Sequence, residues 1–234
     1  MSSSLNRISA LVLVLAGLAM IAGCGGDNKK SDNGATGASG TTGATDNGGQ
    51  ARCKKVAEPA PRRPPRRTRP PKFQLSKDKT YTAKVVTSCG TFDIELDSKQ
   101  APITGGSFVS LVRKGFYNKL IFHRIVTGFV IQGGDPTGTG RGGPGYRVTE
   151  EPPADIVYSE GVVAMAKAGN EPPGASGSQF FVVTSDSQLP PDYALLGKVT
   201  KGMDVVHAIE EVPAGPDERP ISPVVIDKIS VSTK

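Results

Sequence analysis

The sequence predicts a mainly β domain, either a barrel or a sandwich, capped by two helices and extending over residues 73–234. The first observation behind this prediction is a series of short apolar segments, each bounded by residues that favour turns. The second is that apolar residues show helical spacing in only two short segments. This part of the chain is long enough to bury roughly 70% of its unfolded surface in one core.

The domain begins with a predicted β-hairpin followed by a helix. Residues 81–87 and 91–97 alternate between apolar and polar side chains, and the intervening residues 88–90 suit a turn. Pro102 suits the first position of a helix, because its missing N–H is not needed there. Apolar residues at helical spacing follow until Gly115, where we expect the helix to end.

Short strands and one further helix complete the predicted domain. Five apolar segments are predicted strands, at residues 120–126, 129–132, 162–166, 179–184 and 195–199. Residues 203–211 are predicted to be helical because Val205, Val206 and Ile209 share one face. Residues 224–232 alternate again and form the last predicted strand.

The positive charge of the chain is confined to one short segment. The net charge is +6, but nine of the Lys and Arg residues lie in residues 51–72, against the single acidic residue Glu58. The rest of the chain is nearly neutral, so the charge predicts no nucleic-acid-binding domain. Because residues 51–72 are also rich in proline, we expect an extended, semi-rigid spacer. A second interpretation is contact of residues 52–72 with anionic lipid or wall polymer.

The N-terminal residues predict a lipoprotein address. Arg7 precedes an apolar run at residues 8–21, which is too short to span a bilayer but suits a signal peptide over residues 1–23. The run ends at a small-residue site followed by Cys24, which resembles a bacterial lipobox, so Cys24 is the predicted diacylated residue. An ordinary secretory signal is the alternative. Residues 24–50 are predicted to be a flexible linker, and the protein to be extracytoplasmic and anchored in the bacterial cell membrane.

Two cysteines remain if Cys24 is lipidated. An even number of cysteines outside the cytoplasm favours a disulfide, here between Cys53 and Cys89. Such a bond would attach the basic segment to the hairpin turn of the domain. Two free thiols are the alternative.

Three stretches of the domain carry motifs with a chemical meaning. They are FHRIVTGFVIQGGD at residues 122–135, VAMAKA with GSQFF at residues 163–168 and 177–181, and LLGKV at residues 195–199. In this order and spacing they resemble the cyclophilin family of peptidyl-prolyl cis/trans isomerases, over residues 81–234. The resemblance implies a closed, eight-stranded antiparallel β-barrel capped by two α-helices. It also implies isomerisation of X-Pro bonds in proline-containing unfolded or secreted polypeptides, with no metal and no cofactor.

The resemblance assigns the catalytic role to Arg124, assisted by Phe129 and Gln132. The barrier to rotation about a peptide bond is about 18–20 kcal/mol and arises from C–N resonance. Twisting the bond localises a lone pair on the prolyl nitrogen, and a fixed cation that donates to this nitrogen stabilises the twisted state. A planar, permanently charged guanidinium suits this role. Without the flanking motif, a surface or salt-bridged arginine would be the ordinary interpretation of Arg124.

The resemblance also implies a substrate groove. Its expected members are Val130, Gly140, Ala166, Lys167, Ala168, Gln179, Phe181, Leu189 and Tyr193. Many family members have Asn at the position of Lys167, and Tyr193 replaces the His of eukaryotic forms. Trp often stands near the position of Gln188, whereas this chain has no Trp, so weak cyclosporin binding is expected.

Other interpretations of the sequence stay open or are disfavoured. A non-catalytic proline-segment binding module, or a holdase chaperone, would use the same groove, and a wall-adhesion protein would act through the basic segment. The X-Pro bonds of that segment also allow it to occupy the groove of its own domain. Residues 138–143 fit G-x-G-x-x-G, but Pro144 follows and no helix begins there, which disfavours a dinucleotide site. The pair Glu150-Glu151 is expected to be a solvated loop.

Overall fold

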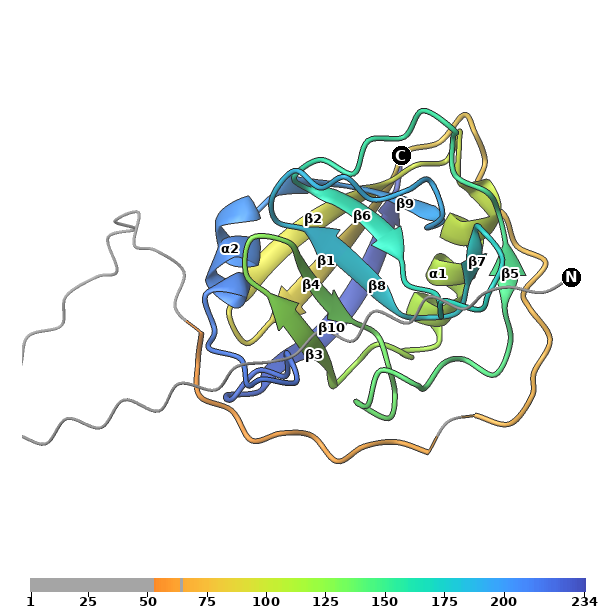
Figure 1. The fold of residues 1–234 in the computed structure, drawn as a ribbon. Helices are drawn as coiled ribbons and strands as arrows, with labels where there is room; N and C mark the ends of the chain where they lie inside the picture. Colours follow the sequence, from red (N-terminus) through yellow and green to blue (C-terminus); the bar gives the residue numbers. More distant parts are fainter. Residues whose placement is uncertain (1–52, 64) are drawn as a thin grey trace, which may run out of the picture. The chain divides into compact units, whose positions relative to one another are not determined.

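Eight strands close into an antiparallel barrel in the computed structural model, which describes residues 53–63 and 65–234 (Figure 1). The order around the barrel is β1-β10-β3-β4-β8-β6-β9-β2. The barrel strands are β1 (Tyr81–Thr87), β2 (Gly90–Leu96), β3 (Leu120–Val126), β4 (Val130–Gly133), β6 (Val162–Met165), β8 (Phe180–Val183), β9 (Leu195–Lys201) and β10 (Val224–Thr233). A separate small sheet pairs β5 (Val148–Thr149) with β7 (Ala175–Ser176).

Two helices pack against this barrel, α1 (Pro102–Arg113) and α2 (Met203–Glu210). The predicted fold class, a closed eight-stranded barrel with two helices, is therefore confirmed. The predicted strands and helices agree with the observed ones to within about two residues at their ends. The two-residue strands β5 and β7 were not expected, because so short a segment carries no period.

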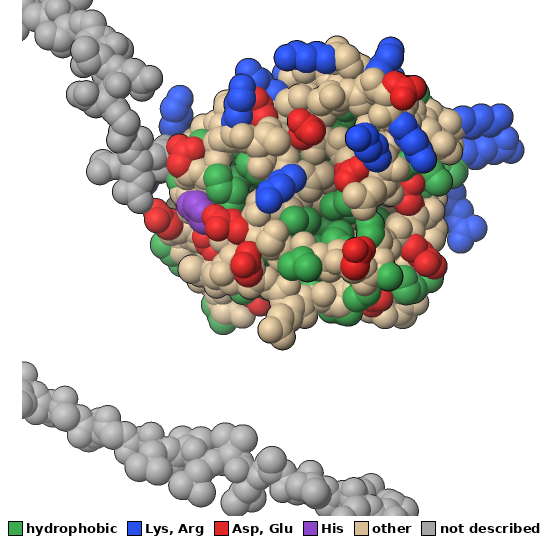
Figure 2. Space-filling view, turned by 90° about the horizontal axis from the view of Figure 1, so that it is seen from above, with side chains coloured by type: hydrophobic (Ala, Val, Ile, Leu, Met, Phe, Trp, Pro, Cys, Tyr) green, Lys and Arg blue, Asp and Glu red, His purple; other side chains and the backbone are tan. Residues whose placement is uncertain are grey.

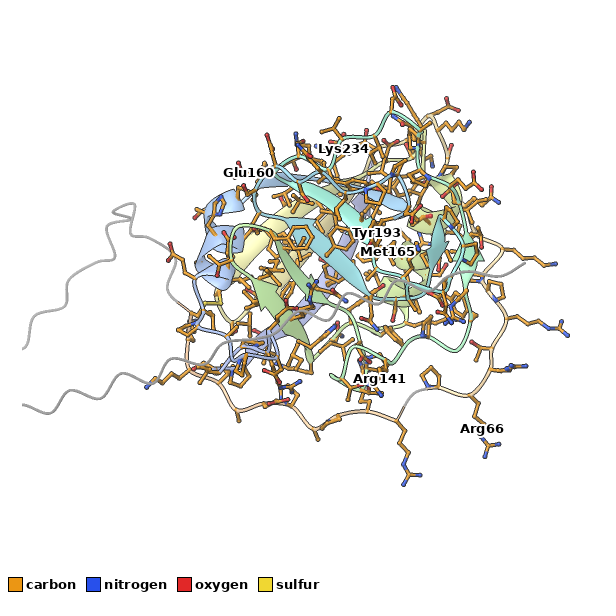
Figure 3. The ribbon with its side chains drawn as sticks, in the orientation of Figure 1. Arg66, Arg141, Glu160, Met165, Tyr193 and Lys234 are labelled. Carbon is orange, nitrogen blue, oxygen red and sulfur yellow. A yellow bond between two sulfur atoms is a disulfide. The ribbon has the colours of Figure 1, made fainter. Side chains whose placement is uncertain are left out.

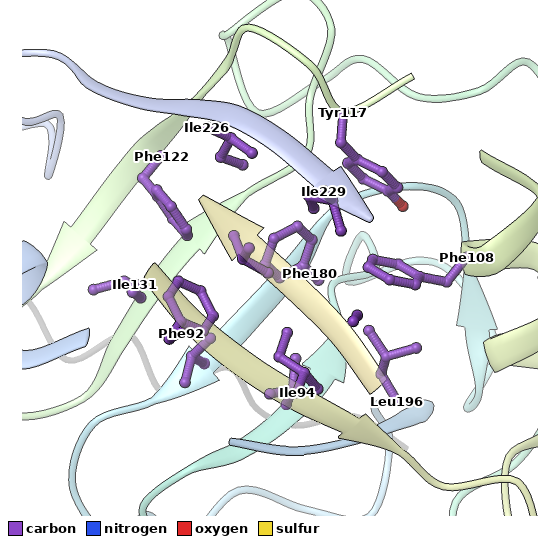
Figure 4. Close-up of a cluster of buried hydrophobic side chains, with 14 of the residues drawn as sticks. Phe92, Ile94, Phe108, Tyr117, Phe122, Ile131, Phe180, Leu196, Ile226 and Ile229 are labelled. Carbon is purple, nitrogen blue, oxygen red and sulfur yellow. The ribbon is translucent and has the colours of Figure 1, made fainter. Parts of the chain in front are cut away.

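The barrel is filled by large apolar side chains (Figure 4). Phe92, Phe108, Phe122 and Phe180 are fully buried there. The ring of Phe180 meets that of Phe108 edge to face, with centroids 6.0 Å apart. Successive side chains of a strand point to opposite faces, so the neighbouring Phe181 belongs to a second apolar cluster outside the barrel. This alternation places one phenylalanine in the core and the next on the surface that carries the candidate site.

Helix α1 begins without a side-chain cap from its own N-terminal residue. The carboxylate of Glu150 caps it instead, accepting the backbone N–H of Ile103 at 3.1 Å and that of Thr104 at 2.7 Å. The expectation of a solvated loop was therefore wrong for Glu150, because unpaired N–H groups at a helix start attract a carboxylate from elsewhere in the chain. Gly106 lies within the helix because a Cβ there would overlap the backbone at Phe73.

Residues 53–63 and 65–72, which we call the arm, lie along the barrel (Figure 1). A disulfide joins Cys53 to Cys89 in the turn between β1 and β2. The backbone N–H of Arg62 donates to the carbonyl of Pro136 at 2.8 Å, and that of Thr68 donates to the carbonyl of Gly145 at 3.0 Å. The basic segment, expected to be an extended, semi-rigid spacer, thus forms backbone hydrogen bonds to the domain over its described residues. Extended backbone leaves its donors unpaired, and the loop that follows β4 offers carbonyls to them.

The expectations for the signal peptide, for Cys24 and for the linker that follows lie outside the described residues. Within the described part of the chain, no helix is long and apolar enough to cross a membrane. Figure 2 shows Lys and Arg side chains interspersed with Asp and Glu on the face seen from above, with apolar side chains between them. The positive charge is therefore not gathered into a continuous patch on that face.

Candidate active site

Three neighbouring strands align the central residues of the candidate site. Arg124 of β3 pairs with Gln132 of β4, and Gln132 pairs in turn with Phe181 of β8. Directly paired residues in an antiparallel sheet share one face, so these side chains form a row on the outer surface of the barrel. The next residue in this row is Ala164 of β6, opposite Phe181. The sequence places these residues far apart, and the closed barrel brings them together.

A chain of polar contacts fixes the guanidinium of Arg124. Its Nη1 donates to Oε1 of Gln132 at 3.3 Å, and its Nε forms an ion pair with Glu218. Nε2 of Gln132 donates to Oε1 of Gln179 at 3.0 Å. Gln179 in turn donates to the carbonyls of Gly140 and Gly142, at 2.9 Å each. The orientation of the cation is thus coupled to the glycine-rich loop, and Gly140 enters the site through its carbonyl.

Sequence analysis missed Glu218, the acidic partner of Arg124. It lies in the loop before β10, 94 positions along the chain, and no motif marks it. Its backbone carbonyl also accepts the N–H of Ile125 at 2.8 Å, which holds the loop against β3. Glu218 is one of two described non-glycine residues with a positive φ, at 62°. The sequence offered no signal for this contact because only the barrel topology brings the loop to Arg124.

An apolar cluster of side chains lies beside the cation. Phe129, Leu189 and Tyr193 pack as partly buried side chains against the cluster that contains the buried Val130 and Phe181. The rings of Phe181 and Tyr193 meet edge to face with centroids 5.4 Å apart. The Arg124 guanidinium carbon lies 6.0 Å from the centroid of the Phe129 ring. The five residues expected to hold the proline ring therefore belong to one cluster, which reaches Arg124 through Phe129, and Val130 and Phe181 are largely buried in it.

Tyr158 supports the rim of this cluster and was not expected from the sequence. Its side chain is fully buried, and its hydroxyl donates to the carbonyl of Tyr193 at 2.7 Å. The same hydroxyl accepts the N–H of Tyr193 at 3.1 Å. Burial raises the pKa of Tyr158 to about 12, so the phenol stays protonated and keeps donating at neutral pH. The backbone of Tyr193 is thereby fixed from below.

The turn that carries Phe129 is anchored to helix α2. The buried carboxylate of Glu210 accepts the N–H of Gly128 at 2.6 Å and the hydroxyl of Thr184 at 2.5 Å. It also contacts Nδ1 of His207 at 3.1 Å. Burial would raise the pKa of Glu210, but these hydrogen bonds outweigh it and hold the pKa below its usual value. The carboxylate is therefore charged at neutral pH and fixes the turn.

A groove of about 710 Å³ continues from the polar chain away from the apolar cluster. The expected residues Ala166, Lys167 and Ala168 line it, together with Gln132 and Gln179. The side chain of Lys167 is only 6% exposed and lies 3.6 Å from a carboxylate oxygen of Asp192. The backbone N–H of Ala166 already donates to the carbonyl of Gln179, and that of Ala168 donates to the Glu171 carboxylate.

The glycine-rich loop of residues 138–143 is held by a carboxylate of the protein itself. Asp135 accepts the backbone N–H groups of Thr137 at 2.7 Å, Thr139 at 3.0 Å and Gly142 at 3.1 Å. These donors are the groups that a phosphate loop would offer to its ligand, so the loop is organised for another purpose. Burial would raise the pKa of Asp135, but hydrogen bonds from Thr137 and Gly142 outweigh it and lower the pKa.

His123 lies buried behind Arg124, and both of its ring nitrogens lack hydrogen-bond partners among the described residues. Burial lowers its pKa to about 4, so the ring is neutral at physiological pH. It therefore adds no charge next to the guanidinium. Among residues 53–63 and 65–234, no group of three or more His, Cys, Asp or Glu side chains is arranged to hold a metal ion.

Comparison with known proteins identifies the family to which the chain belongs. The family model for cyclophilin type peptidyl-prolyl cis-trans isomerases matches residues 82–231, well over half of the chain. The chain belongs to the cyclophilin family. Peptidyl-prolyl cis-trans isomerase-like 1 of Neurospora crassa is 40% identical over 152 residues, which cover 63% of this chain and 91% of that protein. Peptidyl-prolyl cis-trans isomerase A of Mycobacterium tuberculosis is 37% identical over 172 residues, covering 65% and 93%.

Solved structures agree with this assignment. A cyclophilin type isomerase from Cryptosporidium parvum is 34% identical, with a TM-score of 0.61, and covers 65% of this chain and 98% of its own. A second structure of that protein, determined in the presence of the dipeptide Ala-Pro, gives a TM-score of 0.60. This cyclophilin is therefore a peptidyl-prolyl cis-trans isomerase. The arm precedes the matched residues and is an addition to the family domain.

Proposed function

We propose that this cyclophilin isomerises X-Pro bonds of extracytoplasmic proteins and assists their folding, with Arg124 stabilising the twisted imide. The observation that carries the proposal is the row of Arg124, Gln132 and Phe181, which sets a fixed cation beside an apolar cluster of side chains that would receive a proline ring. Phe129, Leu189 and Tyr193 would hold the ring, and the residues around Lys167 would run alongside the substrate chain.

The geometry supports the following mechanism. A guanidinium has five N–H donors, and Glu218 and Gln132 engage those on Nε and Nη1. No described residue accepts a hydrogen bond from Nη2, whose donors would reach a prolyl nitrogen as its lone pair becomes localised. Planar cis and trans imides offer no such acceptor, so the hydrogen bond forms only in the twisted state and lowers the barrier. The apolar surroundings of Phe129 strengthen that bond by excluding water.

The same proposal places the enzyme outside the cytoplasm, anchored to the bacterial cell membrane through Cys24. The disulfide between Cys53 and Cys89 supports an oxidising compartment, because such bonds persist outside the cytoplasm and are rare within it. The predicted lipobox supplies the anchor, and secreted or unfolded polypeptides would be the substrates. Contact of the basic residues 52–72 with anionic lipid or wall polymer would add to the anchoring.

The proposed mechanism is tested by cis-to-trans exchange of an Ala-Pro-Phe peptide, comparing the full chain with Arg124→Ala. Loss of a charged donor to the transition state costs about 2–4 kcal/mol, so kcat/KM should fall by roughly 30- to 1000-fold. Arg113→Ala is the matched control, because Arg113 lies on α1 and stacks on Phe73, away from the site. Equal rates for the parent and Arg124→Ala would overturn the mechanism. No acceleration by the parent would favour the non-catalytic binding module instead.

A further inference from the structure

The arm forms one wall of the substrate groove. Pro65, Arg67 and Thr68 line the same cavity of about 710 Å³ as Lys167 and Gln179. The described arm residues therefore border the groove, and none of them belongs to the apolar cluster around Phe129. Because the family match begins only at residue 82, this wall belongs to the present chain and not to the family domain.

Hydrogen bonds and a disulfide hold the arm against the domain. Near the groove, the backbone N–H and the hydroxyl of Thr68 donate to the carbonyls of Gly145 and Pro144, at 3.0 Å each. Gly145 has a φ of 82°, and a Cβ at this position would overlap the carbonyl of Arg66. Only glycine therefore allows the arm so close to the loop. At the other end, the disulfide of Cys53 holds the arm covalently.

The charges that line this groove are unbalanced. Glu171 is the acidic side chain among the lining residues, and it is engaged by Arg147 and by the N–H of Ala168. Within residues 53–63 and 65–234, neither Arg67 nor Arg141 has an acidic side chain at ion-pair distance, and both are exposed. The arm and the glycine-rich loop thus each contribute a free cation to the groove.

We propose that this groove selects proline-containing segments that carry Asp or Glu next to the X-Pro unit, and that Arg67 of the arm is a specificity-determining residue together with Arg141. A polypeptide whose proline lies against the apolar cluster would continue along the groove that Arg67 and Arg141 line. Its carboxylates would form exposed, charge-assisted contacts there, which are weak individually and are screened by salt. This inference deepens the proposed function and rests on it.

The test uses the full chain and three peptides that share Ala-Ala-Pro-Phe and differ in two flanking residues on each side, which are Asp, Ser or Lys. Exchange rates give kcat/KM at about 0.02 M and 0.5 M salt, and titration gives Kd for the same peptides. The Asp peptide should exceed the Lys peptide by roughly 3- to 10-fold in kcat/KM at low salt, through KM more than through kcat. The difference should nearly vanish at high salt.

Arg67→Ala should lose a substantial part of this preference, measured as the ratio of kcat/KM for the Asp peptide to kcat/KM for the Lys peptide at low salt. Arg66→Ala is the matched control, since Arg66 neighbours Arg67 in sequence but points away from the barrel (Figure 3). A double variant, Cys53→Ser with Cys89→Ser, should reduce the preference in the same way by releasing one end of the arm.

The outcomes separate the two proposals. Equal kcat/KM and equal Kd for all three peptides would overturn the groove inference while leaving the isomerase intact. A preference that Arg67→Ala and Arg66→Ala diminish equally would also overturn it, because the effect would then be the charge of the arm as a whole. Absence of exchange with every peptide would contradict the proposed function, and the Kd values would then decide the inference by themselves.

Discussion

Removing the hydroxyl of Tyr158 would expose how strongly the rim of the apolar cluster depends on a single buried group. Tyr158→Phe keeps the ring in place but deletes the partner of both the carbonyl and the N–H of Tyr193, at 2.7 and 3.1 Å. A buried backbone group left without a partner costs about 1–3 kcal/mol. Because Tyr193 is partly exposed and water can reach it, we expect the free energy of unfolding to fall by about 1–2 kcal/mol.

Urea unfolding followed by circular dichroism measures this loss, since the chain has no Trp to report by fluorescence. The melting temperature should fall by about 2–8 °C for a domain of this size. KM for an Ala-Pro-Phe peptide should rise as the Tyr193 side of the cluster loosens, with kcat changed less. Tyr146→Phe is the control for stability, because in the described part of the chain the hydroxyl of Tyr146 hydrogen-bonds to the side chain of Ser107, at 3.1 Å, and to no backbone group. A stability loss below about 0.5 kcal/mol, with KM unchanged, would refute this account of the rim.

Four other measurements address separate features. Cys24→Ala should move the protein from the membrane to the soluble fraction; retention in the membrane would contradict lipid anchoring. Gly106→Ala should lower the free energy of unfolding by about 2 kcal/mol or more, because its Cβ would overlap the backbone at Phe73, and a gain in stability would refute the clash. Hydrogen bonds to Glu210 and Glu160 raise the pKa of His207 above 6.5, so its stabilising effect should be complete below pH 6.5 and disappear as the pH rises through the raised value. His207→Gln should flatten the pH dependence of the free energy of unfolding in this range. An unchanged slope would show that another group causes the pH dependence. Cyclosporin should inhibit exchange only weakly, and tight inhibition would show that a Trp near Gln188 is dispensable.

Most of the fold could be predicted from the sequence because the spacing of apolar residues within each segment indicates a strand or a helix. The alternation that separates Phe180 from Phe181 can be read in a single segment, and so can the proline at the start of α1. Period and composition suffice for these features. The residues of the row through Arg124 were identified only through the resemblance of their motifs to the cyclophilin family, and the barrel brings them side by side.

The contacts that sequence analysis missed are long-range and come from loops. Glu150 caps a helix more than 40 positions away, and Glu218 pairs with a strand residue 94 positions away. In the sequence, Tyr158 cannot be distinguished from any other core tyrosine. Its role depends on the hydrogen bond from its hydroxyl to the backbone of Tyr193. The docking of the arm depends on backbone groups, which no side-chain pattern encodes. In each case the partner is determined by topology.

The position of the disulfide also decides how mechanical load would enter this domain. Tension on the chain before Cys53 passes through the sulfur bridge into Cys89 and the turn between β1 and β2. The stretch from Lys54 to Ser88, which contains the arm, is thereby left out of the path of the force. Without the bridge, the same tension would peel the arm from the barrel, starting at the hydrogen bond between Lys54 and Ser88. With the proposed anchor at Cys24, the bridge would keep the groove wall in place while bound polypeptides pull on the domain.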